Sequence, residues 1–357
     1  MENAIKMNCV ILSNNVKLTK PFEYFLATLK ELPYSKIVLT DNLGIVGEGE
    51  VCHSIDINGE LQENSNCFEP YVNNVLNKKT SINSVEDISN ILEEVRLFIA
   101  HNTGLLCGVE QALFSILSQK TNKNLTELLG CSRNKKEISI QITIPYLSDI
   151  GEYKNHIQKI VSNHQPAYVK FKIGRNLFLE ISAIKFLQEI CSTISISVDA
   201  NQTFSDVFAA ISFANQLYEL KVAWAEQLLH KDNIKDLRTL RTQIRLPLMV
   251  DEGLHTPLEA EFYAKEKLYD YFNIKLAKTG GILKTLEIIA IAKEYNIPVM
   301  LGSMLHGKIG LEYNLGFALS QNFITQDFYS YFSVSETKEL GYISNDLKVS
   351  FRSLYKY

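Results

Sequence analysis

Three acidic residues stand at the ends of three consecutive β-branched runs: Asp199, Glu226 and Asp251. A carboxylate is a poor strand residue, and three such ends in succession are hard to explain as strand ends that merely meet solvent. Together they offer three hard oxygen ligands with no His or Cys among them. This set suits Mg²⁺ better than Zn²⁺. Such a metal would act as a Lewis acid on a substrate carboxylate whose α-proton is leaving.

Two lysines end the runs on either side of these acids, Lys172 before them and Lys275 after them. A free Lys has a pKa of about 10.4, which is too high for a base at neutral pH. A nearby Mg²⁺ and the neighbouring Lys170 would disfavour the ammonium form and lower that pKa. Two bases facing opposite sides of one carbon can remove a proton from one face and return it to the other. The pair therefore fits racemisation or epimerisation, and it also permits elimination or cycloisomerisation.

These residues require a scaffold in which strand ends meet. From about residue 138, short β-branched runs alternate with helix-length segments, and the runs end roughly every 24 to 30 residues. This alternation predicts parallel strands with helical crossovers. Eight strands favour a (β/α) barrel, whose strand ends converge on one mouth, over a doubly wound sheet, which stays open as the alternative. The predicted strands are Ile138–Ile144, Tyr168–Lys172, Ile194–Asp199, Val222–Glu226, Pro247–Asp251, Phe272–Lys275, Pro298–Gly302 and Phe323–Asp327.

The first third of the chain has a different pattern. Residues 36–48 read as a β-hairpin with a short turn, and residues 85–130 have apolar residues at helical spacing. We therefore expect an α+β domain over residues 1–130 and the barrel over 131–330. Residues 331–357, with a possible strand at Leu347–Phe351, should pack back on the first domain.

Composition excludes several classes of protein. The 357 residues are 46% apolar and 21% charged, an ordinary globular composition, and a net charge of −4 gives no global attraction to nucleic acid or anionic membrane. We expect no membrane-spanning segment and no signal peptide. The six cysteines are scattered without a Cys-x-x-Cys pair, which indicates free thiols and a cytoplasmic location.

The ordered strand-end pattern resembles the muconate-lactonising subgroup of the enolase superfamily, over nearly the whole chain. The matching pieces are Lys-Phe-Lys at 170–172, Asp-Ala-Asn at 199–201, Ala-Glu-Gln at 225–227, Asp-Glu at 251–252 and Lys-Leu-Ala-Lys-Thr-Gly-Gly at 275–281. Supporting pieces are Lys-Pro-Phe at 20–22, Gly-Glu-Gly-Glu at 47–50 and Leu-Leu-Gly at 128–130.

The resemblance implies a modified TIM barrel, (β/α)7β, with an N-terminal α+β capping domain, and it implies a homo-oligomer. It implies Asp199, Glu226 and Asp251 as ligands of Mg²⁺, and Lys172 and Lys275 as the acid/base pair. Lys170 would support the substrate carboxylate and tune Lys172. Two further residues would lie just behind the metal ligands, Asn201 and Glu252.

Within the subgroup the chain looks most like the dipeptide epimerases, for which the substrate is a small dipeptide such as L-Ala-L-Glu. Residues 302–306 resemble their Gly-x-Met-x-Glu stretch with His in place of Glu, and Asp327 keeps the first acid of an Asp-x-Asp pair that holds the substrate ammonium. Tyr329 replaces the second acid, and residues 23–27 lack the basic residue expected of Ala-Glu epimerases. A more apolar dipeptide is therefore equally compatible. The expected substrate-binding residues are Lys170, Thr143, Ser303, Met304, His306, Asp327 and Tyr329.

Other functions remain as alternatives. An o-succinylbenzoate synthase or a muconate cycloisomerase would use the same scaffold, but Asp327 argues against both because their substrates carry no ammonium group. A non-catalytic ligand-binding barrel is disfavoured by the intact set of acids and lysines. Lys278 is interpreted as solvated or lying behind the metal ligands, and Trp224 as packing.

Overall fold

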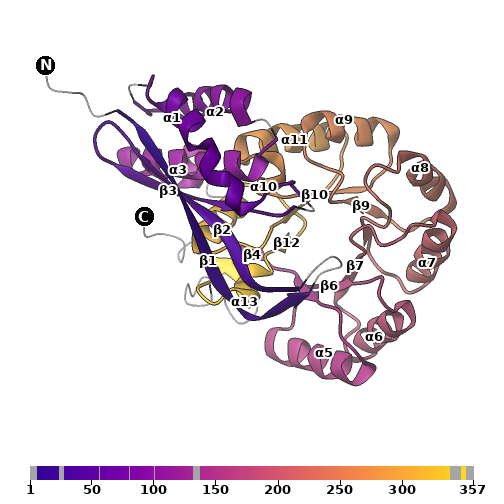
Figure 1. The fold of residues 1–357 in the computed structure, drawn as a ribbon. Helices are drawn as coiled ribbons and strands as arrows, with labels where there is room; N and C mark the ends of the chain where they lie inside the picture. Colours follow the sequence, from indigo (N-terminus) through magenta and orange to yellow (C-terminus); the bar gives the residue numbers. More distant parts are fainter. Residues whose placement is uncertain are drawn as a thin grey trace, which may run out of the picture.

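The computed structural model describes residues 6–23, 28–55, 57–79, 81–99, 101–131, 137–337 and 347–350. Within these ranges an eight-stranded parallel sheet has the order β12-β11-β10-β9-β8-β7-β6-β5, and a parallel bridge from Ile140 to Gln326 brings its two edges together. The predicted barrel, rather than an open sheet, is therefore confirmed (Figure 1). Its strands are β5 (Ile142–Ile144), β6 (Tyr168–Lys172), β7 (Ser195–Asp199), β8 (Ala225–Glu226), β9 (Leu248–Val250), β10 (Tyr271–Ile274), β11 (Val299–Gly302) and β12 (Gln326–Asp327).

The helices that connect these strands lie around the outside of the ring (Figure 1). Five of them begin at an Asp, Asn or Thr whose side chain accepts a hydrogen bond from a backbone N–H of the first turn. Each such cap stabilises its helix by about 0.5–2 kcal/mol, so the sequence itself marks where the chain turns back at the barrel mouth. The helices are α5 (Ile150–His164), α6 (Leu177–Ile190), α7 (Val207–Glu219), α8 (Ile234–Gln243), α9 (Pro257–Glu266), α10 (Leu276–Thr279), α11 (Ile282–Glu294), α12 (Lys308–Ser320) and α13 (Ser330–Ser333).

The alternation of side chains along each strand separates the core from the site. On β10, Phe272 and Ile274 are fully buried in the apolar layer between the strands and the helices, whereas Asn273 and Lys275 have contacts with acidic residues of the mouth. Burying an apolar side chain of this size contributes roughly 1.5–3 kcal/mol. A separate apolar cluster contains Trp224 and Met249 with Tyr168 and Tyr271 packed against it, so Trp224 is indeed a packing residue.

One predicted strand is divided into two strands in the structure. The run at 138–144 divides into β4 (Glu137–Ser139) and the barrel strand β5, because β4 pairs antiparallel with β13 (Lys348–Ser350) instead of continuing into the barrel. The predicted strand at 347–351 corresponds to β13, and Phe351 lies outside the described residues.

The N-terminal part is an antiparallel sheet of β1 (Asn8–Glu23), β2 (Thr28–Thr40) and β3 (Val46–Cys52). It packs against helices through an apolar cluster that includes Ile37 and Leu39. Strand β3 approaches α3 so closely that a Cβ on Gly49 would lie 1.9 Å from the carbonyl oxygen of Gly108. The helical elements are η1 (Gln62–Phe68), α1 (Glu69–Leu76), α2 (Val85–Ile99), α3 (Thr103–Thr121) and α4 (Leu125–Leu128).

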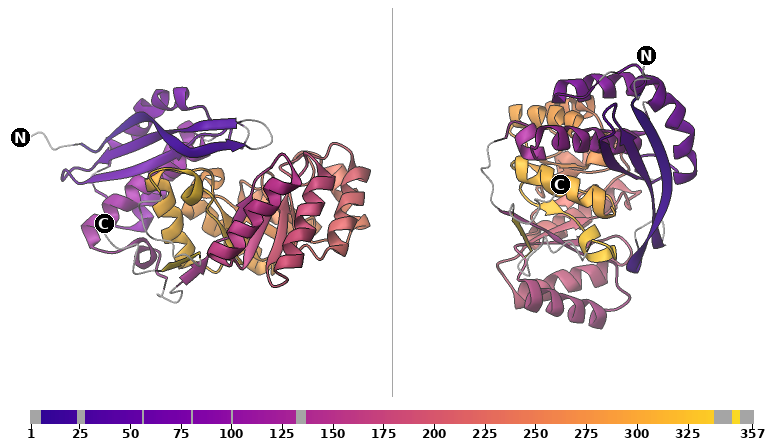
Figure 2. Two further views of the ribbon diagram at one scale, coloured as in Figure 1. Left: turned by 90° about the horizontal axis from the view of Figure 1, so that it is seen from below. Right: turned by 90° about the vertical axis from the view of Figure 1, so that its left-hand side faces the viewer.

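This N-terminal sheet lies over one side of the barrel (Figure 2), and α13 lies beside β1 (Figure 1). Leu18 of β1 forms a bridge with Val334, and the N–H of Ser335 donates to the carbonyl oxygen of Lys17. The segment after residue 330 therefore contacts β1. Within the described residues, no helix is long and apolar enough to cross a membrane.

Two buried glutamates of the N-terminal part bind the starts of barrel helices. Glu50 on β3 accepts hydrogen bonds from the N–H groups of Gly307 at 2.8 Å and Gly310 at 3.0 Å, where α12 begins. Glu110 on α3 accepts from the N–H groups of Ile282 and Leu283 at the start of α11. Both carboxyl groups accept hydrogen bonds from N–H groups of a first helical turn that have no partner within the helix, and these contacts dock the two parts of the protein together.

The docking contact of Glu110 should make stability depend on pH. Burial raises the pKa of Glu110 to about 7, even though its N–H partners lower it. Between pH of about 4.5 and 7 the folded chain therefore retains a proton that the unfolded chain has lost, so the free energy of unfolding falls as the pH rises. We expect this contribution to be on the order of 1–3 kcal/mol.

The measurement is urea unfolding at several pH values between 5 and 8. Glu110→Gln should reduce the downward slope without abolishing it, because burial also raises the pKa of Glu60, to about 8. Glu261→Gln, on the outer surface of α9, is the matched control and should keep the wild-type slope. An unchanged slope in Glu110→Gln would contradict the assignment.

Candidate active site

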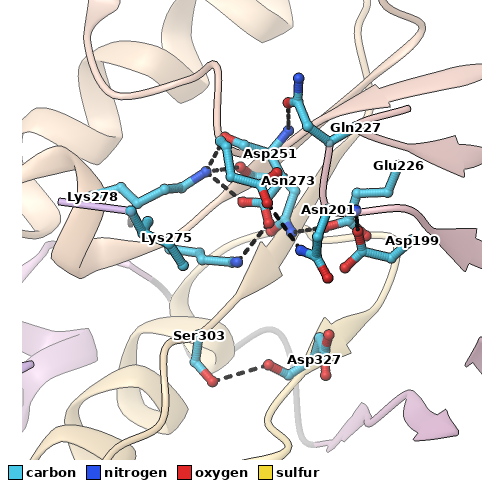
Figure 3. A network of polar contacts seen from close by, with 12 residues as sticks. Asp199, Asn201, Glu226, Gln227, Asp251, Asn273, Lys275, Lys278, Ser303 and Asp327 are labelled. Carbon is cyan, nitrogen blue, oxygen red and sulfur yellow. Dashed lines mark hydrogen bonds and ion pairs between the residues drawn. The ribbon is translucent and has the colours of Figure 1, made fainter. Parts of the chain in front are cut away.

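The three acids predicted as metal ligands lie together at the barrel mouth. Asp199 ends β7, Glu226 ends β8 and pairs directly with it, and Asp251 follows β9. Each is at most 1% exposed, and one oxygen atom from each lies within 4.8 Å of the others. Figure 3 shows the three carboxylates converging. Three buried oxygen donors at this separation suit one divalent cation.

Neighbouring polar groups hold these carboxylates in position. Asn273 Nδ2 donates to Glu226 Oε1 at 2.7 Å, and the backbone N–H of Asn201 donates to Asp199 Oδ1 at 2.9 Å. The side chain of Gln227 accepts the N–H of Asp251 at 3.0 Å and so fixes the turn after β9. Asn201 and Gln227 have φ of 41° and 40°, in the left-handed region, so the chain turns sharply directly after β7 and β8.

The electrostatics of the acids favour a cation. Burial, together with the charges of Asp199 and Asp251, raises the pKa of Glu226 to about 8. Burial also opposes ionisation of Asp199, but Lys172 and Lys170 hold the pKa of Asp199 below its usual value. Two ionised aspartates with a third carboxylate beside them repel one another in a buried site, and a bound cation would relieve that repulsion.

The two predicted bases lie on opposite sides of the acids. Lys172 ends β6 and Lys275 follows β10, and β7, β8 and β9 lie between them in the sheet. Lys172 Nζ donates to Asp199 Oδ2 at 2.6 Å, and Lys275 Nζ donates to Asp251 Oδ2 at 2.6 Å. The amines therefore reach the acid cluster from its two ends.

The acids around Lys275 act on the pKa of its amine, and the expected lowering of that pKa by Mg²⁺ stays a prediction. Burial lowers the pKa of its amine, but the negative charges of Asp251 and Glu226 outweigh burial and raise it above the usual value. The amine is thus a cation bound to a carboxylate. A positive charge placed near these carboxylates, such as a bound cation, would make it easier for Lys275 to lose its proton.

Lys170 and Asp327 occupy the middle of the mouth. Lys170 Nζ forms an ion pair with Asp327 and lies 3.2 Å from Glu226 Oε2 and 3.6 Å from Asp199 Oδ2. Thr143 Oγ1 donates to Asp327 Oδ1 at 3.2 Å, and Ser303 Oγ donates to the backbone oxygen of Asp327 at 3.0 Å. Three of the predicted substrate-binding residues, Lys170, Thr143 and Ser303, therefore contact the fourth, Asp327.

Asn201 and Glu252 lie behind Lys172. Asn201 Oδ1 accepts a hydrogen bond from Lys172 Nζ at 2.6 Å, and Asn201 Nδ2 donates to Glu252 Oε1 at 2.9 Å. Burial, followed by the charges of Asp251 and Asp199, raises the pKa of Glu252 to about 7. The pair thus connects the mouth-facing lysine to the turn after β9.

The remaining predicted substrate-binding residues lie where the N-terminal part meets the barrel. Met304 packs in an apolar cluster with Cys52 and Ala277. His306 is 1% exposed, and its Nδ1 lies 3.2 Å from Glu50 Oε1. Tyr329 is half-buried at the start of α13. The predicted contacts of these three residues with substrate stay predictions, and residues 24–27 lie outside the described residues.

Sequence reasoning missed two polar residues of the site, Asn273 and Gln227. Asn273, which binds Glu226, could have been found because it lies two positions before Lys275 and so shares its face of the strand. Gln227, which binds the turn after β9, carries no comparable signal. For Lys278 the sequence left two alternatives, solvated or behind the predicted ligands, and its full burial against Asp251 agrees with the second.

The fold and the site together define a barrel whose mouth combines three clustered acids, a set that suits a divalent cation, with two opposed amines. The family model for "Enolase C-terminal domain-like" matches residues 152–346, and the chain belongs to this family. Curated relatives include the L-Ala-D/L-Glu epimerase of Clostridium acetobutylicum, 27% identical over 315 residues that cover 87% of this chain and 86% of the relative. They also include the o-succinylbenzoate synthase of Bacillus subtilis, 24% identical over 88% of this chain and 81% of the relative.

A solved structure with the same fold is a dipeptide epimerase from Enterococcus faecalis V583, complexed with Mg and the dipeptide L-Leu-L-Tyr. Its TM-score is 0.85 at 22% identity, and the alignment covers 97% of each chain. The curated epimerases among the relatives support an isomerase of the racemase and epimerase class.

Proposed function

We propose that this protein is a Mg²⁺-dependent dipeptide epimerase, which inverts the carbon next to the C-terminal carboxylate of a dipeptide. The observation that carries the proposal is the placement of Lys172 and Lys275 at opposite ends of the acid cluster. Inversion needs a proton removed from one face of a carbon and another delivered to the opposite face. Two amines in this arrangement supply both.

Asp199, Glu226 and Asp251 would hold the Mg²⁺, which as a Lewis acid stabilises negative charge on the substrate carboxylate. The donor set fits, because all three are buried carboxylates with oxygens close enough to share one ion. Mg²⁺ prefers such oxygen ligands.

The chain's own groups would move the protons. One lysine takes the α-proton on its Nζ while the other, already an ammonium, delivers a proton from the opposite side. The direction of epimerisation decides which lysine begins as the free amine. Lys170, on the strand of Lys172 and fully buried, is close enough to the acids to bind a substrate carboxylate that approaches them.

Asp327 would bind the ammonium of the substrate N-terminus. Its carboxylate is held by Thr143 and paired with Lys170, so a substrate ammonium would compete with Lys170 for it. Because Tyr329 stands where a second acid is expected, the ammonium site has one carboxylate. The apolar cluster of Cys52, Ala277 and Met304 beside Lys275 supports apolar side chains as well as L-Ala-L-Glu.

The proposal is tested by incubating the protein and Mg²⁺ with a library of L,L-dipeptides in ²H₂O. Dipeptides should exchange their α-proton and yield both epimers, detected by mass spectrometry and chiral separation. Asp327→Asn should lower kcat/KM for free dipeptides while affecting N-acetylated ones less, because only the free peptides carry the ammonium. The relative from Bacillus subtilis favours o-succinylbenzoate synthase as a second candidate function. The experiment would decide for it if no dipeptide exchanged its α-proton and the protein dehydrated the substrate of that synthase.

A further inference from the structure

Lys278 is a buried lysine whose ammonium form has no hydrogen-bond donor to spare. It stands three residues after Lys275 on the one-turn helix α10, and its side chain is 0% exposed. Its Nζ donates to Asp251 Oδ1 at 2.6 Å, to the backbone oxygen of Asp251 and to the backbone oxygen of Asn273 at 3.2 Å. A lysine ammonium has three N–H donors, so all of them are used and none is left for a substrate.

Asp251 is held between two lysines that contact different oxygens. Lys278 binds Oδ1 and Lys275 binds Oδ2 (Figure 3). Lys275 is 9% exposed, whereas Lys278 is 0% exposed. Lys275 is therefore the partner that can leave Asp251 for another group, and Lys278 is the partner that stays.

The contacts of Lys278 join the three parts of the site that must keep a fixed spacing. Binding both the side chain and the backbone oxygen of Asp251 fixes the rotamer of this acid and the turn after β9. Binding the backbone oxygen of Asn273 fixes the end of β10. The backbone N–H of Lys278 also donates to the carbonyl oxygen of Lys275 at 2.9 Å, so the same residue closes the turn that carries the base.

We propose that Lys278 is a positioning residue, which presents Asp251 Oδ2 to the divalent cation and sets the distance between that ligand and the base Lys275. The inference rests on the proposed function, since it takes Asp251 as a ligand and Lys275 as a base. Groups behind metal ligands commonly orient the ligand and tune its affinity for the metal.

A merely structural role predicts a different result. A buried lysine beside a buried aspartate also balances charge, and its removal would leave Asp251 with Lys275 as its remaining cation and destabilise the fold. That effect alone would lower the melting temperature and leave metal affinity and turnover per folded molecule unchanged. The two roles are separated by readouts that do not depend on stability.

The experiment compares Lys278→Met and Lys278→Gln with the wild-type full-length chain. Mn²⁺ serves as the probe, and electron paramagnetic resonance of the free ion gives its affinity without any substrate. Lys120→Met is the matched control, because Lys120 lies 3.7 Å from the fully buried Asp41, outside the mouth. Melting temperatures are recorded for every variant, and kcat and KM are measured with an active dipeptide.

Lys278→Met should bind Mn²⁺ about 10- to 100-fold more weakly, with kcat falling more than KM rises. Lys278→Gln, which keeps a donor for Asp251, should recover part of both losses, and Lys120→Met should lose stability alone. Three results would overturn the inference in favour of a structural role. Folded Lys278→Met could bind Mn²⁺ as tightly as the wild type, or Lys120→Met could lose as much affinity as Lys278→Met. The third such result is that neither Lys278 variant folds. If the wild-type chain binds no Mn²⁺, the proposed function itself is refuted. If it binds Mn²⁺ but epimerises no dipeptide, the Mn²⁺ affinities of the wild type and the Lys278 variants still decide the inference.

Discussion

Lys275→Ala should abolish epimerisation and yet leave the protein able to exchange the α-proton of one epimer of a dipeptide. The remaining Lys172 can still remove a proton from its own face, exchange it with solvent and return it to the same face. Lys172→Ala should show the mirror result, with exchange confined to the opposite epimer. Loss of a positioned acid/base group slows a reaction by about 10²–10⁴-fold, so we expect epimerisation to fall by at least this factor in each variant.

The fold should tolerate both substitutions, because each acid keeps a second cation. Asp251 retains Lys278 when Lys275 is removed, and Asp199 retains Lys170 when Lys172 is removed. Melting temperatures near the wild-type value would therefore accompany the loss of activity. This retained pairing makes the variants a test of chemistry rather than of stability.

The measurement follows deuterium incorporation into each purified epimer in ²H₂O by mass spectrometry. Lys265→Ala, on the exposed face of α9, is the control and should behave as wild type. Equal loss of exchange from both epimers in Lys275→Ala would show that one base serves both faces. Undiminished epimerisation would remove Lys275 from the chemistry altogether.

The parts of the fold that could be predicted from sequence are those specified by neighbouring residues. The alternation along β6, β7 and β10 is local, so the facing of Lys172, Asp199 and Lys275 could be read without coordinates. Parallel strands then bring their carboxyl ends to one mouth by geometry alone. The clustering of the three acids could therefore be predicted, because the sequence shows that each of them ends or follows a strand.

Contacts between distant segments could not be predicted in this way. Glu50 meets His306 and Gly307 across more than 250 residues of chain, and Thr143 meets Asp327 only because the barrel closes β5 near β12. Lys278 shows a second limit, since residues 276–279 coil into one helical turn directly after β10. Strand periodicity ends there, and only the turn directs this amine at Asp251.

Glu226→Gln should separate metal binding from folding, because the two respond in opposite directions. Burial and the charges of Asp199 and Asp251 make ionised Glu226 unfavourable in the metal-free chain. An amide of nearly the same shape removes that charge and can still accept the hydrogen bond from Asn273, while Lys170 keeps its ion pairs with Asp327 and Asp199. The melting temperature of the metal-free variant should therefore equal or exceed that of the wild type.

Metal binding should fall far more steeply, because Glu226 is one of three oxygen ligands. We expect a loss of affinity greater than the roughly 10- to 100-fold that follows removal of a group behind a ligand. Since a ligand that binds only the folded state raises its stability, Mg²⁺ should raise the melting temperature of the wild type and not that of Glu226→Gln. Glu60→Gln makes the same chemical change at a buried glutamate that binds the start of α3, and it should keep the response to Mg²⁺. If Mg²⁺ stabilised Glu226→Gln as much as the wild type, the cation would have to be held elsewhere, and the two opposed amines would have no metal-bound carboxylate between them.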